Sequence, residues 1–146
     1  MTPGQGLVAA QFALLTLIVA GGRRRPARPA PVHRAGQCLM LAGAVLAFWS
    51  GHALGRNLTP LPAPVPGGTL IQTGPYRWVR HPLYTALLLL SAGWTAGRGG
   101  LVSGLGTALL TLVLRRKARM EETALAAAYP AYPAYRQRTG AFLPRR

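Results

Sequence analysis

The chain has 146 residues, of which half are hydrophobic and 13% are charged, and its formal charge is +15 because 17 Lys and Arg face two acidic residues. This length fits one domain, and so apolar a composition excludes an ordinary soluble one. The basic residues gather between long uncharged apolar stretches, which is typical of membrane proteins. A nucleic-acid-binding protein would need a soluble scaffold to display its basic face, so we predict no nucleic-acid partner.

Four apolar segments follow one another along the chain, at 7–20, 36–55, 83–96 and 101–114. The first has its arginines after the apolar part, so it resembles an uncleaved anchor more than a signal peptide. The second is long enough to span a membrane alone. The third and fourth fall short of the roughly 20 residues that a span needs. If the third segment begins at Pro82 and the fourth continues through Ala118, the two form an antiparallel hairpin, 82–118, around the turn GRGG at 97–100.

These segments predict an all-α integral-membrane helical bundle of about four transmembrane helices in a single domain, 1–146. Two N-terminal membrane helices occupy 1–55, and a core with the hairpin and a C-terminal helix and tail occupies 56–146. Glycines four residues apart favour close helix packing in lipid, and they occur at Gly51–Gly55, Gly93–Gly97 and Gly100–Gly104.

Cys38 lies within the second apolar run, so we expect a buried thiol. One thiol and two carboxylates are too few for a protein-only metal site.

The segment between the second and third apolar runs is rich in proline, which forbids a regular helix. It is either a plain linker or an ordered loop of the kind that carries function at a membrane boundary.

This proline-rich segment ends in GPYRWVRHPLY, 74–84. Arg77, Arg80 and His81 offer donors there, Pro82 suits the first turn of a helix, and the free amides at 83–85 can face an anion.

The segment RRKARMEETALAAA, 115–128, has high helix propensity and can continue the fourth helix out of the membrane. Lys117 and Glu121 are then neighbours four apart, Arg119 and Glu122 three apart, and Glu121 shares an inward-facing stripe with Leu114. The two glutamates are either a charged helix end or acceptors for hydroxyls or a cation. With the donors of 74–84 they can hold a zwitterion that carries a carboxylate, a cationic centre and a diol.

These motifs together resemble a known family. GPYR-x-VRHP-x-Y, a hairpin, EE-x-x-L and the tail YPAYPAYRQRTGAFLP are similar to the isoprenylcysteine carboxyl methyltransferase and phospholipid methyltransferase superfamily of membrane enzymes, over roughly residues 54–144. The resemblance implies that S-adenosylmethionine binds at the cytosolic face, in a pocket completed by the glutamate helix, and that a lipid-like substrate enters from the bilayer. Two departures are Ala141, where a basic residue is expected, and a shorter N-terminal half.

The resemblance also implies roles for individual residues. The cofactor-binding set is Tyr76, Arg77, Arg80, His81, Pro82, Tyr84, Glu121 and Glu122. Lys117 stands where the family places a basic residue, so the residues expected to act in catalysis are Glu121, His81 and Lys117. In the tail, whose tyrosines can equally serve as an interfacial anchor, the residues expected to contact substrate are Tyr132, Tyr135 and Arg138.

Methyl transfer requires positioning and exclusion of water more than acids, so two carboxylates suffice. A carboxylate acceptor needs no base, whereas an amine must lose a proton, which Glu121 or His81 can take. The sequence is compatible with a carboxylate, an amine or a thiol as the methyl acceptor, and it does not fix the oligomeric state. The alternative function is a non-catalytic membrane scaffold that keeps the fold. We expect the bacterial inner, or plasma, membrane, with 74–84 and 115–146 cytosolic; the side occupied by the basic stretch 23–34 is left open.

Overall fold

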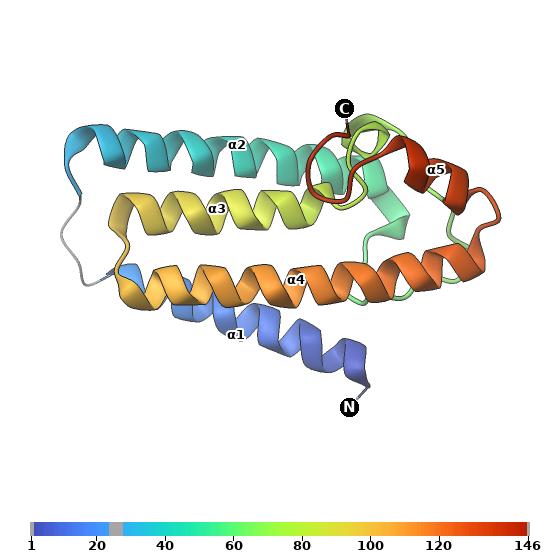
Figure 1. The fold of residues 1–146 in the computed structure, drawn as a ribbon, viewed down its shortest axis with the longest axis horizontal. Coiled ribbons are helices and arrows are strands. Elements are labelled where there is room, and N and C mark those ends of the chain that lie inside the picture. The colour runs from blue at the N-terminus through green and yellow to red at the C-terminus, as the bar shows by residue number, and fades with distance from the viewer. Residues whose placement is uncertain (1, 24–27, 146) are drawn as a thin grey trace.

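Five α-helices make up the fold in this computed structural model, which describes residues 2–23 and 28–145 (Figure 1). They are α1 (Pro3–Arg23), α2 (Ala30–Leu54), α3 (Pro82–Arg98), α4 (Leu101–Ala128) and α5 (Tyr132–Arg138), with 3₁₀ turns at Gly55–Asn57 and Gly74–Arg77. The only β-type pairing among the described residues is an isolated parallel bridge between Val79 and Gly140. The all-α class predicted from the sequence is confirmed.

The predicted hairpin is formed by α3 and α4. Pro82 occupies the first turn of α3, where its missing N–H has no cost. Gly99 and Gly100 make the turn, and a Cβ on Gly99 would meet the Thr95 carbonyl oxygen at 2.0 Å, so only glycine fits there. The basic segment after the apolar run continues α4 without a break, giving a helix of 28 residues. At 1.5 Å per residue it is about 42 Å long, so its C-terminal part extends beyond α3.

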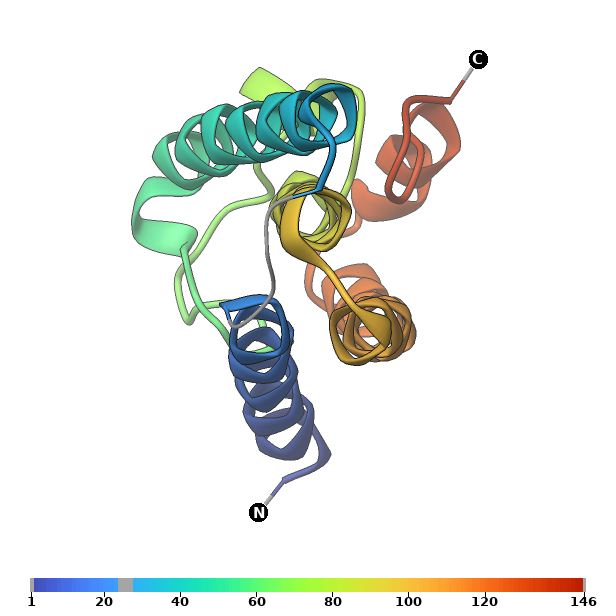
Figure 2. The same ribbon diagram turned by 90° about the vertical axis from the view of Figure 1, so that its left-hand side faces the viewer.

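α3 lies at the centre of the bundle, with α2 on one side and α4 on the other, as the end-on view shows (Figure 2). α2 packs along α3 at very short range because glycines face each other. A Cβ on Gly36 would lie 2.5 Å from the Gly93 carbonyl oxygen and 2.8 Å from the Gly97 nitrogen. Close packing at Gly93–Gly97 is therefore confirmed. The prediction of close helix packing is wrong for Gly51 and Gly104, which face open space.

α1 packs against α4 and forms the apolar core of the bundle with it (Figures 1 and 2). Ile18 is buried with Leu110 and Leu114. The Ile18 carbonyl oxygen accepts hydrogen bonds from the Ser103 hydroxyl, at 2.8 Å, and from the Trp94 indole, at 3.1 Å. These bonds fix the position of α1 along the hairpin of α3 and α4.

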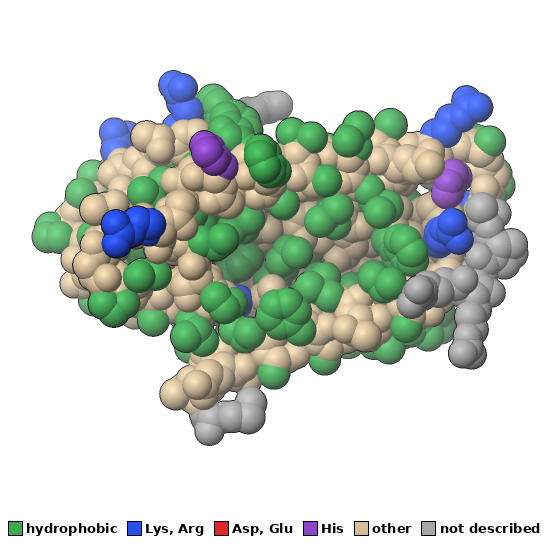
Figure 3. Space-filling view, turned by 180° about the vertical axis from the view of Figure 1, so that it is seen from behind, with side chains coloured by type: hydrophobic (Ala, Val, Ile, Leu, Met, Phe, Trp, Pro, Cys, Tyr) green, Lys and Arg blue, Asp and Glu red, His purple; other side chains and the backbone are tan. Residues whose placement is uncertain are grey.

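The outer surfaces of the helices are strongly apolar. Phe48 on α2 is 79% exposed and Leu101 on α4 is 74% exposed. Seen from behind, hydrophobic side chains cover the middle of the molecule and Lys and Arg lie toward its two ends (Figure 3). An apolar band between basic ends is the surface expected of a protein that contacts a bilayer.

Two helical segments of the described chain are long and apolar enough to cross a membrane, namely Pro3–Gly22 and Ala30–Asn57. Neither α3, with 17 residues, nor α4 meets the same criteria, so the four expected transmembrane helices are not confirmed. The basic stretch 23–34, whose side of the membrane the sequence left open, lies partly outside the described residues.

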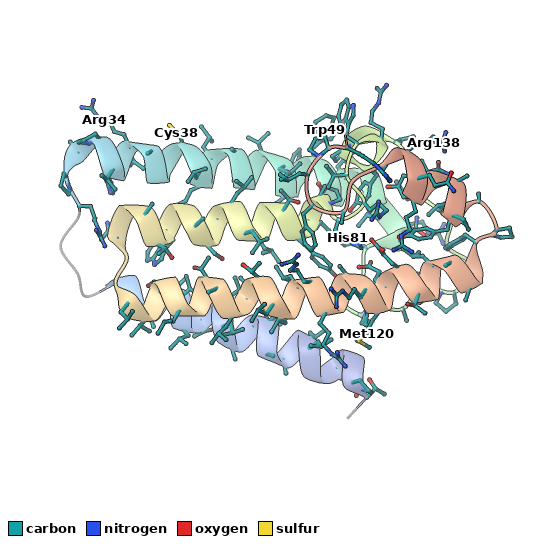
Figure 4. The ribbon with its side chains drawn as sticks, viewed as in Figure 1. Arg34, Cys38, Trp49, His81, Met120 and Arg138 are labelled. Atoms are coloured by element: carbon teal, nitrogen blue, oxygen red, sulfur yellow. The ribbon has the colours of Figure 1, made fainter. Side chains whose placement is uncertain are left out.

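The expectation of a buried cysteine is wrong. Cys38 is exposed on the outer side of α2 (Figure 4). The second apolar run is long enough to form a helix with an outward face, and Cys38 lies on that face, opposite the glycines that contact α3.

Candidate functional site

The proline-rich segment between α2 and α3 is an ordered loop. Asn57 holds its two ends together: its side-chain oxygen accepts from the Thr69 amide at 3.0 Å, and its side-chain nitrogen donates to the Leu54 carbonyl at 3.3 Å. Gly67 and Gly74 have φ of +70° and +57°, values that glycine adopts without strain and that turn the chain back toward α3. The segment is therefore an ordered loop, and that it carries function stays a prediction.

The C-terminal tail pairs with the segment just before α3. The amides of Arg80 and His81 donate to the carbonyls of Gly140 and Ala141 at 2.8 and 3.0 Å. The Thr85 hydroxyl donates to the Phe142 carbonyl at 2.7 Å. These bonds place the chain end against the first turn of α3, beside His81 (Figure 4).

Glu122 joins three parts of the chain. Its carboxylate accepts from Arg80 Nε at 2.8 Å, contacts His81 Nε2 at 3.1 Å and lies 3.4 Å from Arg136 Nε. Burial alone would raise the pKa of the Glu122 carboxyl, but the hydrogen bonds and charges of His81 and Arg80 lower it to about 2. The expected pair between Glu122 and Arg119 is not formed, because Glu122 faces the tail.

Arg80 binds the tail as well as Glu122. Its Nη1 donates to the carbonyl oxygens of Arg136, at 3.1 Å, and Thr139. The guanidinium thus joins the segment before α3 to α4, α5 and the residue after α5 through three acceptors, a geometry that a lysine cannot reproduce.

His81 lies between the two glutamates. Its Nδ1 is 3.4 Å from Glu121 Oε2 and its Nε2 is 3.1 Å from Glu122 Oε1. Burial favours the neutral ring, but hydrogen bonds to Glu121 and Glu122 and their negative charges outweigh it, so the pKa of His81 is raised. The carboxylates on its two sides favour the protonated ring, whose hydrogen bond goes to Glu122 and whose charge also faces Glu121.

Glu121 faces a pocket. The Tyr84 hydroxyl donates to Glu121 Oε2 at 2.9 Å, whereas Oε1 has no protein partner within the described ranges. The Glu121 side chain is 29% exposed against 12% for Glu122. The two adjacent glutamates therefore differ: Glu122 is used by the fold, and Glu121 keeps one oxygen available.

The pocket lies between the ordered loop, the first turn of α3, the C-terminal half of α4 and α5. It holds about 810 Å³ of space free of protein atoms, part of it open to solvent. Its wall combines polar groups with an apolar side formed by Leu70, Ile71, Leu83 and Leu125.

One buried hydroxyl on the pocket wall lacks a partner. The Tyr132 side chain is 1% exposed, and no described group hydrogen-bonds its hydroxyl. Leaving such a group unsatisfied costs about 1–3 kcal/mol. Its neighbour Tyr135, in contrast, donates to the Tyr76 carbonyl at 2.7 Å. Tyr132 also lines the pocket, but its hydroxyl is buried within the protein and not exposed to the pocket space.

Seven of the predicted site residues line this pocket together, and the roles predicted for them stay predictions. They are Tyr76, Arg80, His81, Tyr84, Glu121, Tyr132 and Tyr135. Five others lie outside its wall. Pro82 is buried in the first turn of α3, Glu122 lies behind His81, and Lys117 is buried beneath the Tyr84 ring.

The remaining two predicted site residues, Arg77 and Arg138, are not part of the pocket wall. Arg77 is exposed and stacks on Trp78, 4.9 Å from the ring centroid, and Arg138 bonds the exposed Gln72 at 3.1 Å. The amides of Tyr84 and Thr85, which we expected to face an anion, donate to the His81 carbonyl instead, both at 3.1 Å.

Sequence reasoning missed the residues that the loop contributes to the wall, among them Asn57, Thr59, Leu70 and Ile71. Their only signal was the run of prolines itself, which predicts an extended path but not what that path covers. The described residues contain no cluster of three or more His, Cys, Asp or Glu able to hold a metal ion.

The model of the family described as phospholipid methyltransferase matches residues 32–132. A segment is similar to the cobalt-zinc-cadmium resistance protein CzcN of Cupriavidus metallidurans, with 39% identity over 82 residues. That alignment covers 53% of this chain and 36% of the relative, so the chain spans about a third of the relative's length.

Proposed function

Because the chain belongs to the phospholipid methyltransferase family, we propose that it is an integral-membrane enzyme that transfers a methyl group from S-adenosylmethionine to a lipid-like or membrane-soluble acceptor. The observation that carries this proposal is the pocket lined by Glu121, whose Oε1 has no hydrogen-bond partner among the described residues. The proposed membrane is the bacterial inner, or plasma, membrane. The pocket end lies on the cytosolic side, where S-adenosylmethionine is made.

The polar part of the pocket fits the polar groups of S-adenosylmethionine. Glu121 Oε1 can accept from the ammonium or the ribose hydroxyls. Arg80 uses Nε and Nη1 internally, which leaves Nη2 without a partner in the part of the chain that the structure describes and therefore able to donate to a carboxylate.

The apolar side of the pocket fits the rest of the ligand. Leu70, Ile71, Leu83 and Leu125 offer a surface for the adenine ring or for an apolar acceptor. A largely apolar wall with a few converging polar groups is typical of small-molecule sites. Burial of this kind also keeps water from the reacting atoms.

When bound, S-adenosylmethionine supplies a methyl group on a sulfonium sulfur, which an acceptor atom displaces in line. The chain's residues then serve mainly to position two reactants. His81, held between the carboxylates of Glu121 and Glu122, helps to fix the orientation of Glu121. An acceptor that has to lose a proton would give it to the free oxygen of Glu121, whereas a carboxylate acceptor needs no base.

Ligand binding tests the proposal. Purified protein in detergent should bind S-adenosylmethionine with a Kd in the micromolar range, about −8 kcal/mol, measured by calorimetry. At about 100 times the Kd, the ligand should raise the free energy of unfolding by about 2.7 kcal/mol. No heat and no thermal shift at millimolar ligand would contradict the proposal and favour a non-catalytic membrane scaffold.

A further inference from the structure

α1 lies outside the region that the family model matches, yet it contacts Lys117, one of the predicted site residues. That region begins at residue 32, and α1 ends at Arg23. Most of α1 is apolar, but Gln11, near its middle, is only 7% exposed and faces α4. A polar side chain inside an apolar span is costly unless it has a partner, and it commonly marks a functional contact.

The partner of Gln11 is Lys117. Lys117 Nζ donates to Gln11 Oε1 at 2.8 Å, and the lysine side chain is 1% exposed. Within residues 2–23 and 28–145, this amide oxygen is the one hydrogen-bond acceptor of the ammonium. The ammonium also lies 5.3 Å from the centroid of the Tyr84 ring, whose hydroxyl bonds Glu121.

Lys117 has a competing acceptor close by. Glu121 lies four residues further along α4, on the same side of the helix, which is the spacing at which lysine and glutamate pair. In apolar surroundings the attraction between two opposite charges is far stronger than in water. Without another acceptor, the ammonium would turn toward Glu121 and compete with a ligand for its carboxylate.

We infer that Gln11 is a positioning residue that holds the Lys117 ammonium away from Glu121 and so keeps the Glu121 carboxylate available to the pocket. The inference rests on the proposed function, because the ligand that uses Glu121 is taken to be S-adenosylmethionine. It makes α1 part of the site and not only a membrane anchor.

The test is S-adenosylmethionine affinity across a small set of variants of the full chain in detergent. Gln11→Leu leaves Lys117 without its acceptor and should weaken binding about tenfold or more, the size of one charge-assisted hydrogen bond. Gln11→Glu keeps an acceptor on Lys117 and should stay within about threefold of wild type. Thr16→Val is the matched control on α1, since its hydroxyl bonds only the Phe12 carbonyl of its own helix, and it should change nothing.

Rescue of ligand binding by a second substitution distinguishes a positioning role of Gln11 from a merely structural one. The double variant Gln11→Leu with Lys117→Met removes the competing ammonium, so it should bind more tightly than Gln11→Leu alone. If Gln11→Leu does not fold, Gln11→Asn, which is one methylene too short to reach Lys117, replaces it with the same expected loss.

Three outcomes would overturn the inference. Binding by Gln11→Leu equal to wild type would overturn it and leave the proposed function standing, as would a double variant no better than the single one. Absence of binding by wild-type protein would overturn the proposed function and the inference together.

Discussion

Replacing Glu122 by glutamine tests whether this carboxylate is the clamp that joins α3, α4 and the tail. Its pKa falls from an ordinary 4.5 to about 2, and each pKa unit corresponds to about 1.4 kcal/mol of preference for the charged form. Glutamine can still accept one hydrogen bond from Arg80. We therefore expect Glu122→Gln to lower the free energy of unfolding by about 2–3 kcal/mol at pH 7.

The assay is thermal unfolding of the purified protein in detergent. For a chain of this size, 1 kcal/mol corresponds to about 2–4 °C, so the melting temperature should fall by roughly 4–12 °C. The depressed pKa means that the contribution of Glu122 is complete above about pH 4.5 and is lost as the pH falls toward 2. The difference between variant and wild type should therefore shrink in acid.

Glu121→Gln is the matched control, because Glu121 is next in the chain and more exposed. It should lose less stability than Glu122→Gln while weakening S-adenosylmethionine binding. Equal melting temperatures for wild type and Glu122→Gln at pH 7 would refute the reasoning, as would equal losses of stability and affinity in the two variants.

Four further outcomes are expected. The His81 ring should titrate above pH 6.5 by NMR, and because its folded-state pKa is raised, its stabilising contribution should be complete below about pH 6.5 and decline as the pH rises through the folded value. Arg80→Lys should cost about 1–3 kcal/mol of stability, since the ammonium of lysine lacks the planar fork that reaches these three acceptors, whereas Arg98→Lys, next to the α3–α4 turn, should be silent in the same melts. Tyr132→Phe should leave the melting temperature unchanged or higher, because its buried hydroxyl lacks a protein partner among the described residues. Gly36→Ala should lower the melting temperature, because its Cβ would lie 2.5 Å from a backbone oxygen of α3.

The features that were predicted from the sequence are mostly local. The hairpin follows from Pro82, the glycine turn and two apolar runs, and the extension of α4 follows from the helix propensity of its basic segment. The grouping of His81 with Glu121 came from the family resemblance, and the family match supports that resemblance.

The features that were missed depend on contacts between distant segments. Glu122 was assigned to Arg119 because the two are near on α4, whereas its actual partners come from α3 and the tail. The buried residues of α2 are Gly36, Gly43 and Ser50, seven residues apart, and the two glycines contact α3; that partner cannot be read from the spacing alone.

Gln11 shows the same limit for the site. A glutamine within an apolar helix is a recognisable signal, but its partner Lys117 lies 106 residues away, and only the packing of α1 on α4 brings them together.

The central claim is that the pocket beside Glu121 supports methyl transfer to a membrane-soluble acceptor. The most direct measurement is incubation of membranes containing the protein with methyl-labelled S-adenosylmethionine, followed by extraction and analysis of the apolar products. The account predicts a labelled extractable product with wild-type protein and a strongly reduced amount with Glu121→Gln. Equal labelling by both proteins, or none above that of membranes without the protein, would contradict it.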